Sequence, residues 1–209
     1  PKNGTYHVDP VKCEGCRLCE RICPADAITS SRSRENTWYI SDSRFGPLVH
    51  AEMGPGEENS GKLVSLLRKK ARELAKERNA TWIINDGPPG IGCAAISSLT
   101  GTDAAIIVTE PTLSAFHDLE RLTELFKSFK LQSFAIINKA DLNPEMLPSL
   151  RKFLGEHHIE VIAEIPFSTA VVQAMTEGRS VTEFAPISEL VQKLYDAWDI
   201  IEVRLGNKK

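Results

Sequence analysis

Residues 103–109 read DAAIIVT, residues 133–138 read SFAIIN and residues 159–165 read IEVIAEI. Each run is short, apolar and rich in β-branched residues, which is typical of a buried strand. Residues 114–129 and 144–158, which separate these runs, have the apolar spacing of amphipathic helices. Strands that alternate with helices predict βαβ units, and therefore a doubly wound, mostly parallel α/β sheet with helices on both faces.

The flanking sequence extends this pattern in both directions. We expect a helix over residues 61–79, a further strand over 81–85, a short helix over 93–99, and C-terminal helices over 169–177 and 187–198. Residues 1–53 are different, because Pro and Gly interrupt them and only residues 38–40 and 48–52 suggest a hairpin, around a Gly46–Pro47 turn. We therefore predict a small module over residues 1–53 and an α/β domain over residues 54–209.

Composition excludes several classes of protein. The 209 residues are 42% hydrophobic and 25% charged, with a net charge of −3, which is ordinary for a globular chain and does not suit nucleic-acid binding. No run approaches the roughly 20 apolar residues of a membrane span, and no secretory signal is visible. Because four of the five cysteines lie close together, as metal ligands do in reducing compartments, we predict a cytoplasmic location.

Residues 13–24 read CEGCRLCERICP, which is the C-x2-C-x2-C-x3-C-P run of bacterial-type ferredoxins. Soft thiolates at this spacing wrap a tight loop around a cubane, and a glycine in the loop lets the backbone approach the sulfides. We predict that Cys13, Cys16, Cys19 and Cys23 are ligands of a [4Fe–4S] cluster. The alternatives are a zinc knuckle and four unrelated buried cysteines.

The number of clusters stays open at one or two. In two-cluster ferredoxins the fourth cysteine of such a run binds the other cluster, whose remaining ligands come from a second run. This sequence contains no second run, and its one further cysteine, Cys93, is more often a small buried hydrophobe than a ligand.

Residues 81–92 read TWIINDGPPGIG, so that an acid follows a predicted buried strand and precedes a glycine-rich turn. An acid at the carboxyl end of a parallel strand faces the ligand crevice of an α/β sheet. Asp86 would hold Mg²⁺ through water, and the backbone at Gly87 and Gly90 could approach a γ-phosphate. The alternative is a strand-ending turn with an incidental acid.

Two further stretches suggest a nucleotide. Asn138 and Lys139 begin an N-K-A-D sequence directly after a predicted strand, where the amide would contact a base and the lysine stem would pack over the ring. Residues 56–63 read GEENSGKL and resemble a phosphate loop up to Lys62, but Leu63 replaces the hydroxyl residue that binds Mg²⁺. The alternative for this stretch is a surface loop before a capped helix.

Taken in order, DGPPG (86–90), VTEPT (108–112), INK (137–139) and IP (165–166) resemble the C-terminal part of the MinD/ParA/Mrp class of P-loop ATPases. With a ferredoxin run before them, the chain is similar to the members that carry an inserted ferredoxin domain. The resemblance implies two [4Fe–4S] clusters, Mg²⁺–ATP binding and a homodimer across the nucleotide. It implies catalytic roles for Asp86 and Gly90, and nucleotide contacts for Asn138 and Pro166. From the motifs themselves we add Gly87, Pro88, Lys139 and Lys62 as candidate nucleotide contacts.

The chain departs from this class at its beginning. Members start with a strand and a phosphate loop that has an extra lysine, and members with the insert then show a first cysteine run. Neither stretch is present, and the chain begins at Pro1, so we expect an N-terminally incomplete member whose sheet has a gap or an exposed edge.

Three functions follow from these expectations. The first is an ATPase whose nucleotide state is coupled to electron transfer or to iron–sulfur cluster handling, with a redox or cluster-acceptor protein as partner. The second is an iron–sulfur electron carrier or scaffold with a vestigial nucleotide domain. A positioning protein of the MinD or ParA kind ranks below both, because the tail over residues 198–209 is short and mixed in charge.

Overall fold

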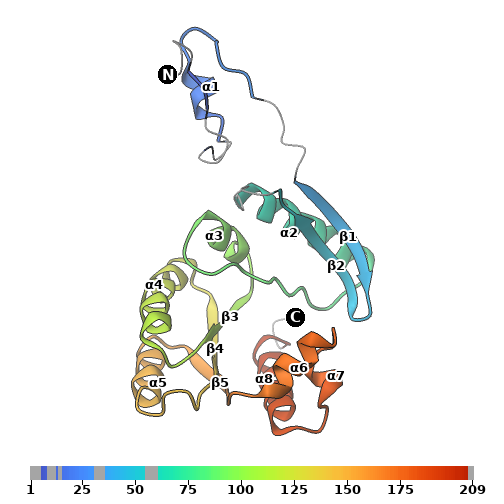
Figure 1. Cartoon of the computed structure of the whole chain (residues 1–209), viewed down its shortest axis with the longest axis vertical. Coiled ribbons are helices and arrows are strands. Elements are labelled where there is room, and N and C mark those ends of the chain that lie inside the picture. Colours follow the sequence, from blue (N-terminus) through green and yellow to red (C-terminus); the bar gives the residue numbers. More distant parts are fainter. Residues whose placement is uncertain (1–5, 9–12, 14–15, 31–35, 55–60, 207–209) are drawn as a thin grey trace. The chain divides into compact units, whose positions relative to one another are not determined.

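The computed structural model describes residues 6–8, 13, 16–30, 36–54 and 61–206. The chain divides into two compact units, Pro1–Ser98 and Leu99–Lys209 (Figure 1). The predicted boundary between residues 53 and 54 does not coincide with this division and stays a prediction.

The first unit holds one short helix, a hairpin and two further helices among its described residues. Its elements are α1 (Leu18–Ile22), β1 (Thr37–Ser43), β2 (Gly46–Glu52), α2 (Gly61–Glu77) and α3 (Cys93–Leu99), which ends at the border of the second unit. The predicted helices over 61–79 and 93–99 are therefore confirmed.

The predicted hairpin is present, but its turn lies earlier than expected. β1 and β2 pair antiparallel with Ser43 opposite Gly46, so the turn residues are Arg44 and Phe45, and Pro47 belongs to β2. The Ser43 hydroxyl explains this position, because it donates to the Gly46 carbonyl at 2.6 Å and accepts from the Phe45 amide at 3.2 Å. Gly46 has a φ of 122°, a conformation that residues with a Cβ rarely adopt.

The predicted strand over residues 81–85 is wrong. The structure has no strand there, and Ile83 and Ile84 are 42% and 79% exposed. A strand exists only where a neighbouring strand accepts its ladder of hydrogen bonds, and within the described residues no strand pairs with this segment. The apolar run satisfies the sequence pattern for a strand without forming one.

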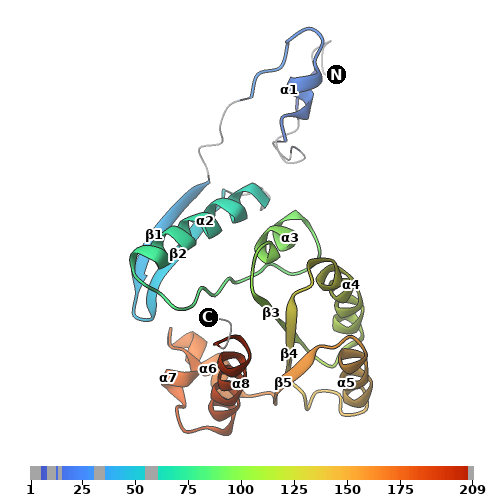
Figure 2. The same ribbon diagram turned by 180° about the vertical axis from the view of Figure 1, so that it is seen from behind.

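The second unit has the predicted alternation of strands and helices. Its elements are β3 (Ala104–Thr109), α4 (Leu113–Phe129), β4 (Gln132–Asn138), α5 (Leu147–Glu156), β5 (Glu160–Ile165), α6 (Thr169–Thr176), α7 (Val181–Phe184) and α8 (Glu189–Gly206). The strands form a three-stranded parallel sheet in the order β3-β4-β5. The views from both sides show α4 and α5 on one face of this sheet and α6 to α8 on the other (Figures 1 and 2), which confirms the predicted fold class.

Two helix boundaries differ from the expectation. α5 begins at Leu147 rather than at Pro144, because Pro148 lacks an N–H group and is tolerated only in the first turn of a helix. α8 continues past Trp198 to Gly206, because Ile201 and Leu205 prolong its apolar stripe and Ile201 is buried.

The core of the second unit lies between the sheet and the helices α4 and α5. Ala135 and Ile137 on β4 are fully buried there, and Leu119 of α4 and Leu154 of α5 pack in the same cluster. Successive strand residues point to opposite faces, so Phe134, which is 1% exposed, faces the side of α8. β4 is thus buried on both faces, as a central parallel strand should be.

β3 is less protected than β4. Within the described residues it pairs with β4 alone, and Ile106 and Val108, which alternate with its buried residues, are 44% and 66% exposed. This strand forms an edge of the sheet within the described residues.

Candidate functional site

The cysteine run surrounds the helix α1. Cys16 precedes this helix, Cys19 lies within it and Cys23 follows it as the C-cap residue. Cys13, Cys16 and Cys19 are exposed, whereas Cys23 is half-buried. The remaining residues of the short helix lie between Cys19 and Cys23 and account for the longer third spacing of the motif.

Backbone amides gather around the Cys23 sulfur. The Ala27 amide donates to Sγ at 3.4 Å, and the backbone N–H groups of Ala27, Ala25, Ile28 and Asp26 lower the pKa of this thiol, that of Ala27 most strongly. Asp26 has a φ of 48°, which turns the chain back around the sulfur. The thiolate is the form of cysteine that binds metals, so this environment suits a metal ligand.

Glu20 fastens the helix α1 to the segment that follows it. Its carboxylate accepts from Arg17 Nε at 2.7 Å, from the Ser30 hydroxyl at 2.8 Å and from the Ser30 amide at 3.2 Å. These hydrogen bonds, that of Arg17 first, lower the pKa of Glu20 to about 2. Sequence reasoning missed this residue, because the ferredoxin motif specifies only the cysteines and the proline and gives no role to an acid between them.

The donors fit an iron–sulfur cluster in their chemistry. Soft thiols occur at ferredoxin spacing, and one of them has a lowered pKa. No three His, Cys, Asp or Glu side chains are gathered as metal ligands within the part of the chain that the structure describes. Cys93 is exposed at the start of α3.

A second set of candidate residues lies where the parallel strands of the second unit end. Lys139, directly after β4, donates through Nζ to Glu110 Oε2, directly after β3, at 2.9 Å. The Ala140 amide donates to the carbonyl of Ile165 at the end of β5 at 2.9 Å. The loops that follow all three strands are therefore joined at the carboxyl ends of the strands, and we call this end of the sheet the Asn138 edge.

Asn138 and Lys139 occupy this edge with Pro166, so the structure brings these three predicted residues together. Asn138 Oδ1 accepts from the Lys139 amide at 3.0 Å, and Lys139 has a φ of 50°. All three are half-buried. Their predicted role beside a nucleotide base stays a prediction.

Sequence reasoning missed two residues of the same edge. Glu110 lies in the VTEPT stretch and Asp141 ends the N-K-A-D stretch, but neither was chosen as a site residue. Asp141 Oδ1 accepts from the Phe167 amide at 2.7 Å and so joins the loops after β4 and β5. For Glu110 the available signal is an acid directly after a buried strand, and for Asp141 it is the acid that ends the N-K-A-D stretch.

The predicted phosphate-side residues belong to the first unit. Asp86 is exposed in the irregular segment before α3, and Gly90 has a φ of 83°, which favours glycine. A Cβ on Gly87 would lie 3.3 Å from Ser98 Oγ, so this glycine permits a close approach to α3. Pro88 between them is half-buried.

Lys62 is the second residue of α2 and is exposed. The preceding loop residues 56–60 of the phosphate-loop candidate lie outside the described residues. Its Gly61 packs closely on α3, because a Cβ there would lie 2.5 Å from Ser97 Oγ and 3.0 Å from the Cys93 carbonyl oxygen.

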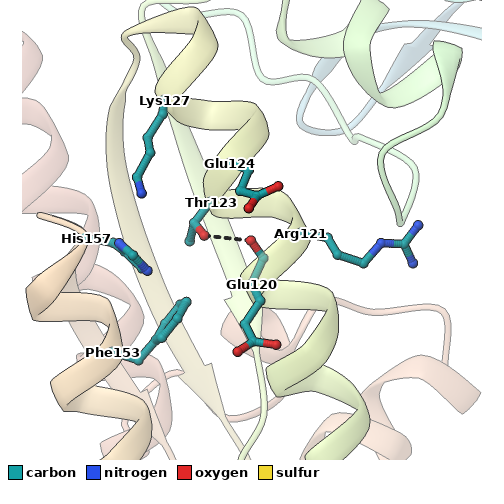
Figure 3. A pocket seen from close by; sticks show the side chains of 7 residues that line it. All are labelled: Glu120, Arg121, Thr123, Glu124, Lys127, Phe153 and His157. Carbon is teal, nitrogen blue, oxygen red and sulfur yellow. Dashed lines mark hydrogen bonds between the residues drawn. The ribbon is translucent and has the colours of Figure 1, made fainter.

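A shallow hollow of about 340 Å³ lies between α4 and α5. Figure 3 shows its seven lining side chains, which are those of Glu120, Arg121, Thr123, Glu124, Lys127, Phe153 and His157. Helices that follow parallel strands run back along them, so Lys127 and His157, near the C-terminal ends of these helices, lie toward the amino ends of the strands. The hollow is therefore separate from the Asn138 edge.

Comparison with known proteins supports both halves of the expectation. Residues 6–29 match the family of 4Fe–4S binding domains. An uncharacterized protein of Methanocaldococcus jannaschii, MJ0578, is 30% identical over 92% of this chain, which spans 65% of that relative.

Solved structures show the same fold. MinD of Aquifex aeolicus matches with a TM-score of 0.59 at 19% identity, covering 78% of this chain and 67% of that chain. MinD of Pyrococcus horikoshii, solved with Mg-ADP, matches with a TM-score of 0.53 at 22% identity, covering 67% and 58%. Within the described residues no helix is long and apolar enough to cross a membrane.

Proposed function

We propose that this chain, which joins a 4Fe–4S binding segment to the fold of MinD-type ATPases, is part of an ATP-binding iron–sulfur protein. In this proposal, nucleotide binding is coupled to electron transfer or to cluster handling. The observation that carries it is the occurrence of both parts in one chain. The sign of such a coupling would be a γ-phosphate contact that orders a switch loop.

The cysteine run would hold the iron–sulfur group through Cys13, Cys16, Cys19 and Cys23. When bound, that group supplies one-electron chemistry. The chain itself prepares the Cys23 sulfur by surrounding it with backbone N–H groups, and it fixes the helix α1 through Glu20. A reducing compartment suits exposed thiols, which supports the proposed cytoplasmic location.

The proposed nucleotide contacts are the residues that the sequence motifs single out. We assign Asp86 to the magnesium side, with Gly87, Pro88 and Gly90 near the phosphates and Lys62 as an additional cation. We assign Asn138, Lys139 and Pro166 to the base side. The relative that binds Mg-ADP has the same fold, which supports the choice of ligand. A homodimer across the nucleotide belongs to the same proposal.

The experiment loads the chain anaerobically with iron and sulfide and then titrates Mg²⁺–ATP by calorimetry. We expect iron and acid-labile sulfide to bind together, and both to fall in Cys19→Ser. We expect Asp86→Asn to weaken nucleotide binding in the presence of Mg²⁺ while the iron content stays the same. Zinc without sulfide would contradict the iron–sulfur assignment.

A second candidate is an iron–sulfur carrier or scaffold whose nucleotide domain is vestigial. Leu63 favours it, because a phosphate loop carries Ser or Thr at that position to bind Mg²⁺. Iron and sulfide would then bind in the absence of any ATP affinity. The Lys62→Ala variant separates the two candidates at this loop. If Lys62 contacts the phosphates, the variant binds ATP more weakly than the original chain does.

A further inference from the structure

We infer that Glu110 is a positioning residue, which neutralises the Lys139 ammonium and so keeps phosphate groups away from the edge formed by Asn138, Lys139 and Pro166. The carboxylate contacts Nζ at 2.9 Å, while the two side chains are 35% and 41% exposed. A ligand that reaches this edge would therefore meet an ion pair rather than a free cation. The inference rests on the proposed nucleotide binding and deepens it, because it assigns the orientation of the nucleotide.

The backbone of Lys139 shows why a lysine stands at this position. Its φ of 50° lies in the left-handed region, where glycine, asparagine or aspartate is more common. Three contacts hold it there: its amide donates to Asn138 Oδ1, its carbonyl accepts from the Leu142 amide at 2.9 Å, and its ammonium reaches Glu110. Only the third contact requires a lysine side chain.

The position of the pair makes its charge matter. Loops at the carboxyl ends of parallel strands are where α/β sheets bind ligands, and an unpaired ammonium there attracts anions. The triphosphate of a nucleotide would then compete with the base for this edge. With Glu110 in place the edge has no net charge from this pair, so an uncharged base fits it better than a phosphate does.

The test uses the purified chain and two probes, ATP and inorganic tripolyphosphate, titrated separately at low salt. In Glu110→Gln the lysine loses its partner, so we expect tripolyphosphate affinity to rise about threefold to tenfold. The preference for ATP over tripolyphosphate should fall by a similar factor. Glu110→Asp keeps the charge and should keep most of the original preference.

The matched control is Glu160→Gln. Glu160 pairs with Arg204 at 2.9 Å at the start of β5, which is the opposite end of the sheet. This variant also removes one surface carboxylate from an ion pair, so it should leave the binding of both probes unchanged. A rise of tripolyphosphate affinity in both variants would indicate a general effect of net charge and would overturn the inference.

The remaining outcomes separate the inference from the proposed function. Unchanged tripolyphosphate affinity in Glu110→Gln overturns the inference, whether or not ATP binds. If ATP fails to bind the original chain while tripolyphosphate affinity still rises in the variant, the proposed function fails and the neutralising role of Glu110 stands. If Glu110→Gln binds neither ATP nor tripolyphosphate and also unfolds at a lower urea midpoint, Glu110 has a structural role alone, and the inference is overturned.

Discussion

Substitution of Ile137 by alanine should weaken the second unit strongly, because this side chain is fully buried on the central strand β4. The change removes about three methylene equivalents, which is about 2.4 kcal/mol of transfer free energy at 0.8 kcal/mol each. The cavity that remains adds to this, so we expect a loss of about 3–4 kcal/mol.

The matched control is Val108→Ala on β3. It also replaces a β-branched residue by alanine in a strand, but Val108 is 66% exposed, so we expect a loss of about 0.5 kcal/mol. Hydrogen exchange measured by mass spectrometry suits this comparison, because peptides from β4 report the opening free energy of the second unit alone. Equal losses in the two variants would refute the arrangement of the sheet.

Three further substitutions test local features. Ser180→Ala removes the capping box of α7 and should cost about 1 kcal/mol, measured by urea unfolding against a Ser128→Ala variant at an exposed site in α4. Gly61→Ala places a Cβ 2.5 Å from Ser97 Oγ and should destabilise the first unit by about 1–3 kcal/mol, whereas an unchanged urea midpoint would contradict the close packing of α2 on α3. The Arg151 guanidinium lowers the pKa of Glu164, so the ion pair stabilises the fold at pH values above the ordinary pKa of glutamate. This stabilisation is lost as the pH falls through the lowered pKa. The acid-unfolding curve of Glu164→Gln should therefore lack this pH-dependent loss.

The fold of the second unit could be predicted because its strand sequences carry apolar residues at successive positions. Runs such as DAAIIVT and SFAIIN place apolar residues toward both layers of helices, and this pattern needs no knowledge of distant contacts. The run over residues 81–85 carries the same signal and failed, since pairing depends on a neighbouring strand that the pattern does not specify. The hairpin turn was misplaced because the hydrogen bonds of Ser43 outweighed the turn preference of Gly46–Pro47.

The candidate site was only partly predictable for a related reason. Motif spacing identified the cysteine run and Asn138, and the family comparison supports the former. Glu110 lies 29 positions before Lys139, so only the parallel pairing of β3 and β4 brings the two side chains together. Contacts of this kind follow from the register of a sheet and are not visible in any local pattern.

The strand order of the second unit has a consequence for how this part of the chain acquires its structure. Each strand pairs with the next strand along the sequence, so the sheet can grow in the order in which a ribosome delivers it. Each pairing nevertheless spans the helix between the two strands, as in Ala104 with Gln132, so it is a long-range contact that forms more slowly than contacts within a helix. The helix α8, which contacts β5, is synthesised after all three strands. It contributes four buried residues to the packing, namely Leu190, Val191, Ala197 and Ile201. Until α8 has been synthesised, the nascent sheet would expose its second apolar face, and at that stage it would depend most on chaperones.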